Sequence, residues 1–401
     1  MRALGVICAG WGWLCGQSPP QLDVLAPEIV RLSEIRQHML WNLHRQPNYT
    51  CVETVERSHR ASASRKFQLQ DTLRLEVALV EGKEMFGWPG AKKFEDTDLR
   101  DIVPSGAIGN GNFALHARAV FESNAATFQY RGETSLDGRP SERYDFRVPL
   151  MLSGYNIRVG ANESIVAYHG SFFADPKSRD VQRIEVIADD IPVVLGLTYA
   201  SDRMEYARTL IGDSEFLLPS ASELTMIDLT GRESHNHVRF ASCKQFSGES
   251  VLTFDEAPAD APVAARVEEI ELPQDLALVL RLIDQVDSDS SAVGDLVHAQ
   301  LDRDVKFKGR VLMPKGAVGV GRITRLERHD DYTLLGLEFL ELEAAGLRAH
   351  FRAKLENVVA GPFLGLMSRP IQPGPRPGEG LIQIRSGRLR LSRGMLMFWR
   401  T

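Results

Sequence analysis

Two groups of side chains in the 401-residue sequence have the types and spacing that metal ions require. His235 and His237 lie two positions apart in a predicted strand, so both imidazoles face the same side and are suited to begin a zinc site. Asp284, Asp287 and Asp289 gather in a serine-rich turn, where carboxylates suit Ca²⁺. The histidines lack an identifiable third ligand, and the aspartate turn lacks the glycine and glutamate positions of an EF-hand loop. We therefore interpret both groups as surface side chains and predict no metal site.

Short motifs that assemble a hydrolytic or redox centre are absent from the sequence. It contains no Gly-x-Ser-x-Gly, no His-Glu-x-x-His and no Cys-x-x-Cys. We expect a non-catalytic protein without a cofactor. A hydrolase with an unrecognised site is a competing class, which titratable groups with perturbed pKa values converging in one pocket would favour.

The first residues predict export. Met1 and Arg2 give a positive start, and residues 3–16 are an uncharged run that ends in small residues, the order of a cleaved secretory signal. This run is too short to cross a bilayer comfortably, and an uncleaved anchor is the alternative. We therefore expect a periplasmic or secreted protein whose membrane association is at most peripheral. The net charge of −6 argues against nucleic acid as a partner.

Removal of a signal at residues 1–16 leaves two cysteines, Cys51 and Cys243. In an oxidising compartment such a pair forms a disulfide where the geometry permits. Two buried free thiols are the alternative.

The elements that would position these residues are mostly strands. Residues 27–45 have the apolar spacing of one amphipathic helix, and many short strand segments follow as far as residue 254. Residues 96–102 and 112–121 have helical spacing and flank a glycine-rich stretch. Residues 255–271 are rich in alanine, proline and acidic side chains and read as a linker, after which strands resume over residues 272–401. The pattern predicts two mainly β domains.

The arrangement of residues 27–254 resembles outer-membrane lipoprotein carriers and related lipoprotein-sorting domains. A helix leads directly into an antiparallel meander after an export signal, and residues 132–139, 181–186 and 216–220 are similar to segments common in that group. The resemblance implies a curved antiparallel sheet, an incomplete barrel, lined by apolar side chains and closed by small lid helices. It also implies a lipid or acyl chain as cargo.

A curved sheet with helices over its concave face can leave an apolar cavity, the usual ligand site in such a fold. Core packing explains most of the aromatic side chains in this part of the chain. The residues that we expect to line a ligand cavity are Phe86, Trp88, Phe128, Tyr130, Phe146, Phe172 and Tyr199.

Residues 286–299, 304–305, 310–317 and 321–323 are similar to the barrel domain of conjugation-type (type IV) secretion-channel proteins. Glycines that admit turns and a proline that fixes φ define the motif. Its residues are Gly294, Pro314, Lys315, Gly316 and Gly321. The chain lacks the proline-rich neck and the cytoplasmic segment of those channels. The resemblance therefore implies a small all-β barrel domain in common with them, and not membership of a secretion channel.

Taken together, these features predict an exported, non-catalytic cell-envelope protein. The N-terminal sheet would bind an apolar ligand or a lipidated protein segment, and the C-terminal barrel would dock to an envelope protein partner. The alternative is a structural component of an envelope or secretion-related assembly, without a ligand cavity.

Overall fold

The computed structural model describes residues 25–90, 94, 99–102, 113–246, 267–359, 368–371, 378–385 and 389–401. The expected signal at residues 1–16, the glycine-rich stretch and the linker up to residue 266 lie outside the described residues.

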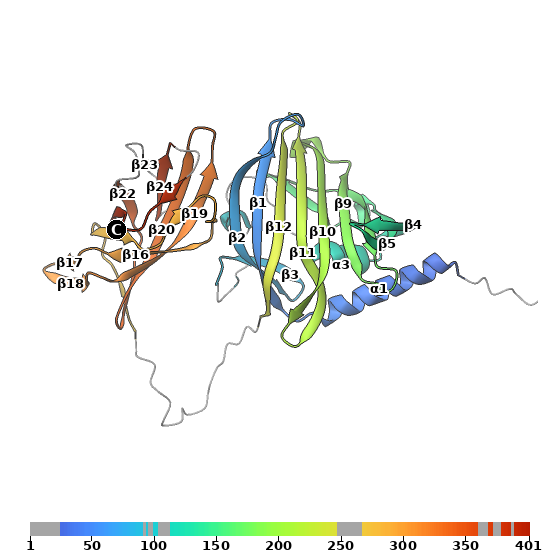
Figure 1. The fold of residues 1–401 in the computed structure, drawn as a ribbon, viewed down its shortest axis with the longest axis horizontal. Helices are drawn as coiled ribbons and strands as arrows, with labels where there is room; N and C mark the ends of the chain where they lie inside the picture. The colour runs from blue at the N-terminus through green and yellow to red at the C-terminus, as the bar shows by residue number, and fades with distance from the viewer. Residues whose placement is uncertain are drawn as a thin grey trace, which may run out of the picture.

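A ten-stranded antiparallel sheet forms the N-terminal part, in the order β3-β2-β1-β12-β11-β10-β9-β8-β5-β4 (Figure 1). Its strands are β1 (Tyr49–Arg60), β2 (Gln68–Val80), β3 (Lys83–Gly87), β4 (Thr127–Leu136), β5 (Arg139–Val148), β8 (Ala167–Ala174), β9 (Val181–Asp189), β10 (Leu197–Ile211), β11 (Ser214–Asp228) and β12 (Glu233–Gln245). The helices are α1 (Pro27–Arg45), α2 (Leu99–Ile102) and α3 (Leu115–Phe121), and two 3-10 turns are η1 (Leu150–Leu152) and η2 (Val193–Leu195). A small hairpin consists of β6 (Asn156–Val159) and β7 (Asn162–Ile165).

Alternation of side chains along the strands determines which face of this sheet is buried. In β1 and β10, every second residue is buried over most of the strand. Register shifts interrupt the pairing of β1 with both of its neighbours, of β10 with β11, and of β4 with β5. Because each extra residue bends its strand and increases the local twist, the sheet curls and gains a concave face.

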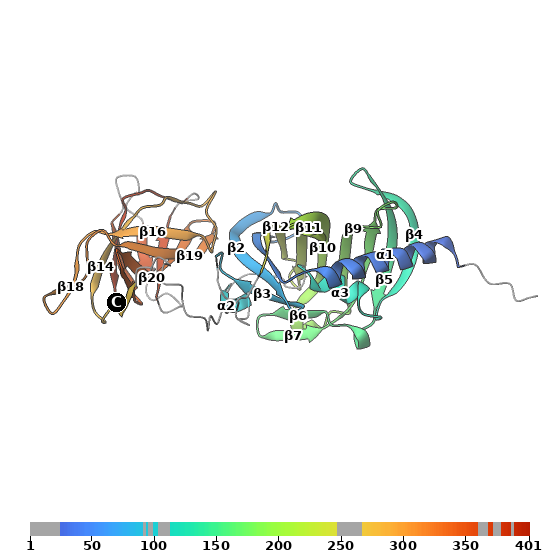
Figure 2. The same ribbon diagram turned by 90° about the horizontal axis from the view of Figure 1, so that it is seen from below.

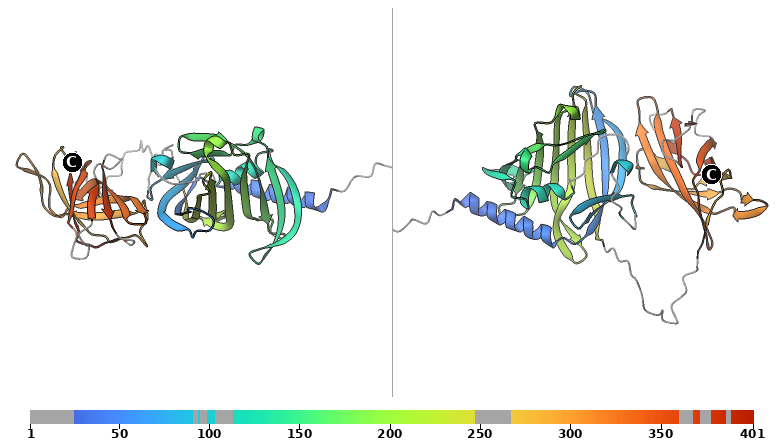
Figure 3. Two further views of the ribbon diagram at one scale, coloured as in Figure 1. Left: turned by 90° about the horizontal axis from the view of Figure 1, so that it is seen from above. Right: turned by 180° about the vertical axis from the view of Figure 1, so that it is seen from behind.

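Helix α1 covers part of that concave face. Pro27 stands at its first turn, where the missing backbone N–H costs nothing, and the chain leaves the helix just before Pro47. Its buried residues are Ile35, Met39, Asn42 and Leu43. Figures 2 and 3 show α1 and α3 next to each other on one side of the sheet. They close a core whose other side is built by β5, β8, β9 and β10.

A second curled sheet forms the C-terminal part, with the main order β13-β21-β20-β19-β16-β14-β26-β22 and with β24 pairing β20 and β23. Its strands are β13 (Glu268–Glu271), β14 (Ala277–Leu282), β16 (Leu296–Leu301), β19 (Val318–Arg328), β20 (Thr333–Ala344), β21 (Leu347–His350), β22 (Lys354–Val359), β23 (Ser368–Ile371), β24 (Glu379–Ile384) and β26 (Leu396–Arg400). Two small ladders join β15 (Val286–Asp287) to β25 (Arg390–Leu391), and β17 (Val305–Phe307) to β18 (Arg310–Met313).

The mainly β fold class, with an N-terminal helix and a curled, open sheet, is confirmed. One boundary needs correction: the expected linker at residues 255–271 runs into strand β13, which pairs in parallel with β21. The acidic residues of β13 resembled a solvated linker because Glu268, Glu269 and Glu271 are exposed at the sheet edge. Within the described residues, no helix is both long and apolar enough to span a bilayer.

Candidate functional site

Aromatic side chains form a continuous apolar surface on the concave face of the N-terminal sheet. Tyr144 and Phe172 stack with ring centroids 5.0 Å apart, and Phe121 of α3 meets Phe172 edge-on at 5.1 Å. Phe128 and Tyr130 of β4 pack against the same cluster. Such aromatic pairs contribute both apolar burial and specific ring contacts.

Helix α1 lies over this aromatic surface and is attached to the sheet by both apolar and polar contacts. The Asn42 side chain donates a hydrogen bond to the Leu217 carbonyl and accepts one from the Leu217 N–H, each at 2.8 Å. Arg31 pairs with Glu142 at 2.8 Å, and the Tyr144 hydroxyl donates to the Glu28 carbonyl at 3.2 Å. Only three apolar side chains of the helix are fully buried. The arginines of the helix also cover the aromatic surface, because Arg31 lies over the Tyr130 ring and Arg36 over the Phe128 ring.

A row of five buried side chains, four of them polar, crosses the concave face next to the aromatic cluster. The sheet register places Asp71, Arg57, Asn236, Leu224 and Asp202 side by side on β2, β1, β12, β11 and β10. All five side chains are buried. Arg57 Nε donates to Asp71 Oδ1 at 2.7 Å, and a second nitrogen of the same guanidinium donates to the other carboxylate oxygen. This fork geometry satisfies a buried ion pair that would otherwise be costly.

At the other end of the row, Asp202 contacts side chains from two elements over the concave face. The Tyr155 hydroxyl donates to Asp202 Oδ2 at 3.1 Å, and His116 Nε2 of α3 lies 3.3 Å from the same oxygen. Burial, reinforced by the Asp202 carboxylate, raises the pKa of Tyr155 well above its usual value. The phenol therefore stays protonated and acts as a hydrogen-bond donor.

Glu53 and Tyr49 of β1 are polar groups inside the same face. Both are almost wholly buried, and Glu53 Oε2 and Tyr49 Oη have no hydrogen-bond partner among the described residues. Burial, with a smaller contribution from Glu84, raises the pKa of Glu53 to about 8. Each unpartnered buried group costs about 1–3 kcal/mol of folding free energy. The presence of both polar groups in this interior therefore needs an explanation.

Four of the seven residues that we expected to line a cavity lie together. Phe128, Tyr130, Phe146 and Phe172 belong to the aromatic cluster under α1 and α3. Phe86 is buried in a different core, among side chains of β1, β2 and β12. That the four residues line a ligand cavity stays a prediction.

Trp88 and Tyr199 do not belong to the aromatic cluster. Trp88 lies against the C-terminal part, where the Arg322 guanidinium sits 5.2 Å from its ring centroid. Tyr199 is half-buried and precedes the buried Ala200 in β10, so strand alternation places it on the opposite face. The sequence alone does not reveal the bulge between Leu197 and Tyr199 that determines this orientation.

The polar groups Glu53, Arg57, Asp71, His116 and Asp202 were missed in the sequence analysis. For β1 a signal was present, because Glu53 and Arg57 alternate in phase with Tyr49, Cys51 and Val55 and must share their face. No comparable signal identifies the pairing of Asp202 with His116, which depends on tertiary packing.

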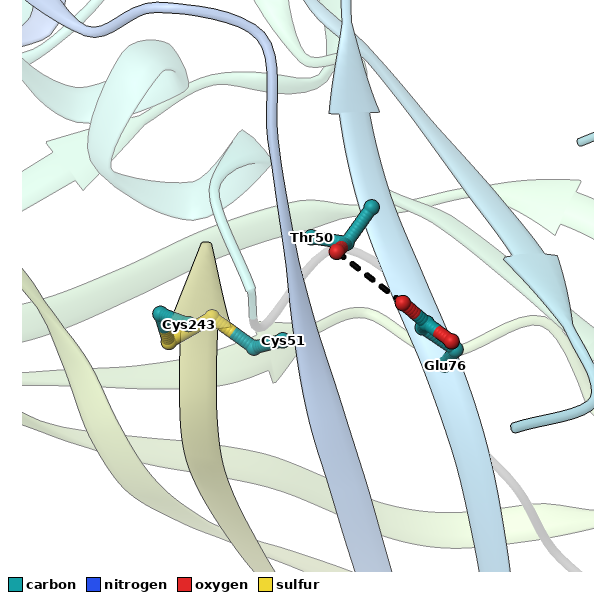
Figure 4. Close-up of a disulfide and its surroundings, with 4 residues drawn as sticks. All are labelled: Thr50, Cys51, Glu76 and Cys243. Atoms are coloured by element: carbon teal, nitrogen blue, oxygen red, sulfur yellow. Dashed lines mark hydrogen bonds between the residues drawn. A yellow bond between two sulfur atoms is a disulfide. The ribbon is translucent and has the colours of Figure 1, made fainter. Parts of the chain in front are cut away.

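The disulfide Cys51–Cys243 is present and joins β1 to β12 (Figure 4). It spans 192 residues of sequence and lies where a register shift interrupts the β1–β12 ladder. Thr50 points away from it and donates to Glu76 Oε1 at 3.0 Å. The bond closes the β1–β12 seam, which is formed between the first and last strands of the sheet in sequence.

The glycines of the barrel motif have three different structural roles. Gly316 adopts a φ of +94° in the turn after Pro314, and the Lys315 N–H donates to Asp304 Oδ1 at 2.9 Å. Gly321 makes room within β19, where a Cβ would lie 2.6 Å from the Phe339 ring. Gly294, with a φ of +102°, packs directly on β2 of the N-terminal sheet.

The junction between the two parts is built around Gly294. The Arg74 N–H donates to the Val293 carbonyl at 2.7 Å, and the Val293 N–H donates to the Thr72 carbonyl at 2.9 Å. Arg74 also forms an ion pair with Asp295. These contacts cover the free edge of β2, which β3 pairs only over residues 76–80. A covered edge is protected from pairing with other chains.

His235 and His237, the two histidines with the spacing of zinc ligands, lie next to a carboxylate. His235 and His237 of β12 lie 3.8 and 3.7 Å from the two carboxylate oxygens of Glu223 on β11. In the described part of the chain, no group of three or more histidine, cysteine or acidic side chains is placed to hold a metal ion.

Comparisons with known proteins give little further information. No family model matches the sequence, and no curated protein matches it. A solved domain from Vibrio parahaemolyticus, described as an outer membrane lipoprotein-sorting protein domain, aligns with 52% of this chain and 92% of its own at 13% identity. Its TM-score of 0.29 is too low to support an argument about fold or function. Nothing in these comparisons supports the resemblance to secretion-channel barrels, which stays a prediction from the motif.

Proposed function

We propose that this is an exported, non-catalytic envelope protein that binds an apolar ligand, or a lipidated protein segment, on the concave face of its N-terminal sheet. The C-terminal sheet would serve as a docking module toward an envelope partner. The proposal requires neither a cofactor nor a metal ion.

The observation that carries the proposal is the aromatic surface beneath α1. Phe128, Tyr130, Tyr144, Phe146 and Phe172 present a continuous apolar face, and α1 contributes only Ile35, Met39 and Leu43 as fully buried apolar side chains. An acyl chain offers the same kind of apolar contact as Ile35, Met39 and Leu43, so it can compete with the helix for the aromatic surface.

Native mass spectrometry of the purified mature protein, combined with lipid extraction and with exchange of a fluorescent palmitoyl probe, tests this function. We expect a co-purifying lipid or saturable probe binding. Phe172→Ala should weaken probe binding, whereas Phe67→Ala should not, because Phe67 lies outside the aromatic cluster and is partly exposed. A protein without lipid that also fails to bind the probe would exclude a carrier function.

The structural alternative is supported by a different observation. Trp88, one of the expected ligand residues, is engaged at the junction instead, where it contacts Gly294 and Arg322. In a purely structural protein, we expect all the aromatic side chains to be engaged in packing contacts of this kind. Probe binding separates the two functions, because only the ligand-binding one requires an apolar ligand on the N-terminal sheet, whereas a docking partner is expected in both.

A further inference from the structure

Three polar side chains from β1 and β3 lie near one another beside the aromatic cluster, whose member Tyr206 acts electrostatically on Tyr49. Glu53 and Tyr49 lie four residues apart on β1, and Glu84 of β3 is close enough to act electrostatically on both. Glu84 is already engaged, because its Oε1 accepts hydrogen bonds from the N–H groups of Ala114 and Leu115 at 2.7 and 3.2 Å. Of the other two side chains, Glu53 Oε2 and Tyr49 Oη have no hydrogen-bond partner among the described residues.

Aromatic rings enclose these two groups. The Phe113 ring lies 5.1 Å from the Tyr49 ring and 5.1 Å from the Phe240 ring. Phe240 is the direct neighbour of Glu53 across the β1–β12 ladder, and Leu75 is its neighbour on β2. The carboxyl group of Glu53 therefore has apolar neighbours on both adjacent strands, and one of them, Phe240, packs against Phe113.

This environment determines what chemistry the two groups present. A carboxyl group whose pKa is about 8 is mainly protonated at neutral pH and then has an O–H to donate. The phenol of Tyr49, whose pKa burial also raises, is a second neutral donor. Two neutral donors in an apolar enclosure are complementary to the oxygen of a carbonyl group, and an apolar chain attached to that carbonyl would fit the rings around them.

We propose that Glu53 and Tyr49 form the polar end of the ligand site and donate hydrogen bonds to the carbonyl oxygen of an acyl ester or amide. This inference rests on the proposed function and specifies its ligand class. In the present arrangement the Phe113 ring packs against Tyr49 and against Phe240, the neighbour of Glu53, so the acyl ligand takes the place of this ring.

The test is a competition experiment on the full mature protein. An acyl ester, an alkylamine and an alkane of equal chain length each compete with a fluorescent alkyl probe. We expect the ester to bind roughly 3- to 10-fold more tightly than the alkane, the range that one or two net hydrogen bonds provide. Glu53→Gln, which keeps a neutral donor, should retain this preference, and Glu53→Leu should lose it while still binding the alkane.

The matched control is Glu56→Leu, which changes a glutamate on the other face of the same strand, where it pairs with Arg239. It should leave the ester preference unchanged. Equal affinity for ester and alkane in the wild type, or a preference for the amine that Glu53→Gln abolishes, would overturn the carbonyl assignment. Failure of the alkyl probe to bind at all would instead overturn the proposed function.

The pH dependence gives a second readout. Above about pH 8, ionisation of Glu53 removes its donor, so the ester preference of the wild type should fall while that of Glu53→Gln stays constant. The described titratable and charged groups in or beside this face are Tyr49, Arg57, Asp71, Glu84, His116, Arg118, Tyr155, Asp202 and Tyr206. An ester preference that falls equally in both proteins would assign the effect to one of these groups and contradict the role of Glu53.

Discussion

At the residue scale, the distinctive feature of the molecule is ionisable chemistry inside an apolar fold. Arg57 and Asp71 pair with each other, whereas Glu53, whose Oε2 has no hydrogen-bond partner among the described residues, avoids ionisation by keeping its proton. The two situations predict opposite responses to mutation and to pH.

Glu53 should make stability depend on pH. Its folded-state pKa of about 8 lies above the ordinary glutamate value, so the folded state binds the proton more tightly than the unfolded state. The contribution of Glu53 to stability is fully present below the unfolded pKa and is lost as pH rises through the folded one. Between about pH 4.5 and 8, the free energy of unfolding should fall by up to about 1.4 kcal/mol per pH unit relative to Glu53→Gln. Urea denaturation of both proteins across this range measures the difference, and parallel pH profiles would contradict it.

The Arg57–Asp71 pair should show strong non-additivity. Removing one partner leaves the other charge buried and alone, so Arg57→Met or Asp71→Leu alone should cost about 3–5 kcal/mol. The double variant should regain most of that loss because no unpaired charge remains. The free energy of unfolding of all four proteins gives the coupling, and additive effects would show that the pair is not isolated from water.

At the element scale, local patterns predicted the type of the elements much better than their partners. The spacing of Ile35, Met39 and Leu43 predicts α1, and alternation predicts β1 and its buried face. Neither the helical spacing nor the strand alternation predicts that β1 pairs with β12, because that pairing joins residues almost two hundred positions apart. Strand β13 was missed because its pattern is that of an exposed edge rather than of a core strand.

Asn42 should control how firmly α1 is attached. Its replacement by alanine leaves the Leu217 N–H and carbonyl without their partner, at a cost of about 1–3 kcal/mol. We expect faster hydrogen exchange along α1 and tighter binding of a fluorescent palmitoyl probe, because the helix competes less strongly for the aromatic surface. Gln37→Ala, at an exposed position of the same helix, is the control. Unchanged exchange in Asn42→Ala would mean that other contacts determine the position of the helix.

At the scale of the whole molecule, the two sheets meet through a turn that the sequence analysis assigned only to the barrel. Gly294 was recognised as a turn glycine, and its left-handed φ agrees with that. Its contact with Arg74 was beyond sequence reasoning, since nothing in the local pattern links residues on opposite sides of the segment that joins the two parts.

Gly294→Ala should loosen the junction. The added Cβ would lie 2.1 Å from the Arg74 carbonyl oxygen, and the left-handed backbone also disfavours alanine. Small-angle scattering should show a larger radius of gyration, and β2 should become easier to cleave with a protease. Gly316→Ala is the matched control because it introduces the same backbone strain inside the C-terminal sheet, away from the junction. Equal behaviour of the two variants would indicate that strain, and not the contact with Arg74, causes the change.

The most direct measurement of the central claim is equilibrium binding of a fluorescent palmitoyl probe to the full mature protein, with Phe172→Ala as the comparison. The account predicts saturable binding by the wild type with one probe per chain, and clearly weaker binding by the variant at unchanged folding. Absence of saturable binding to a correctly folded, lipid-free wild type would contradict it.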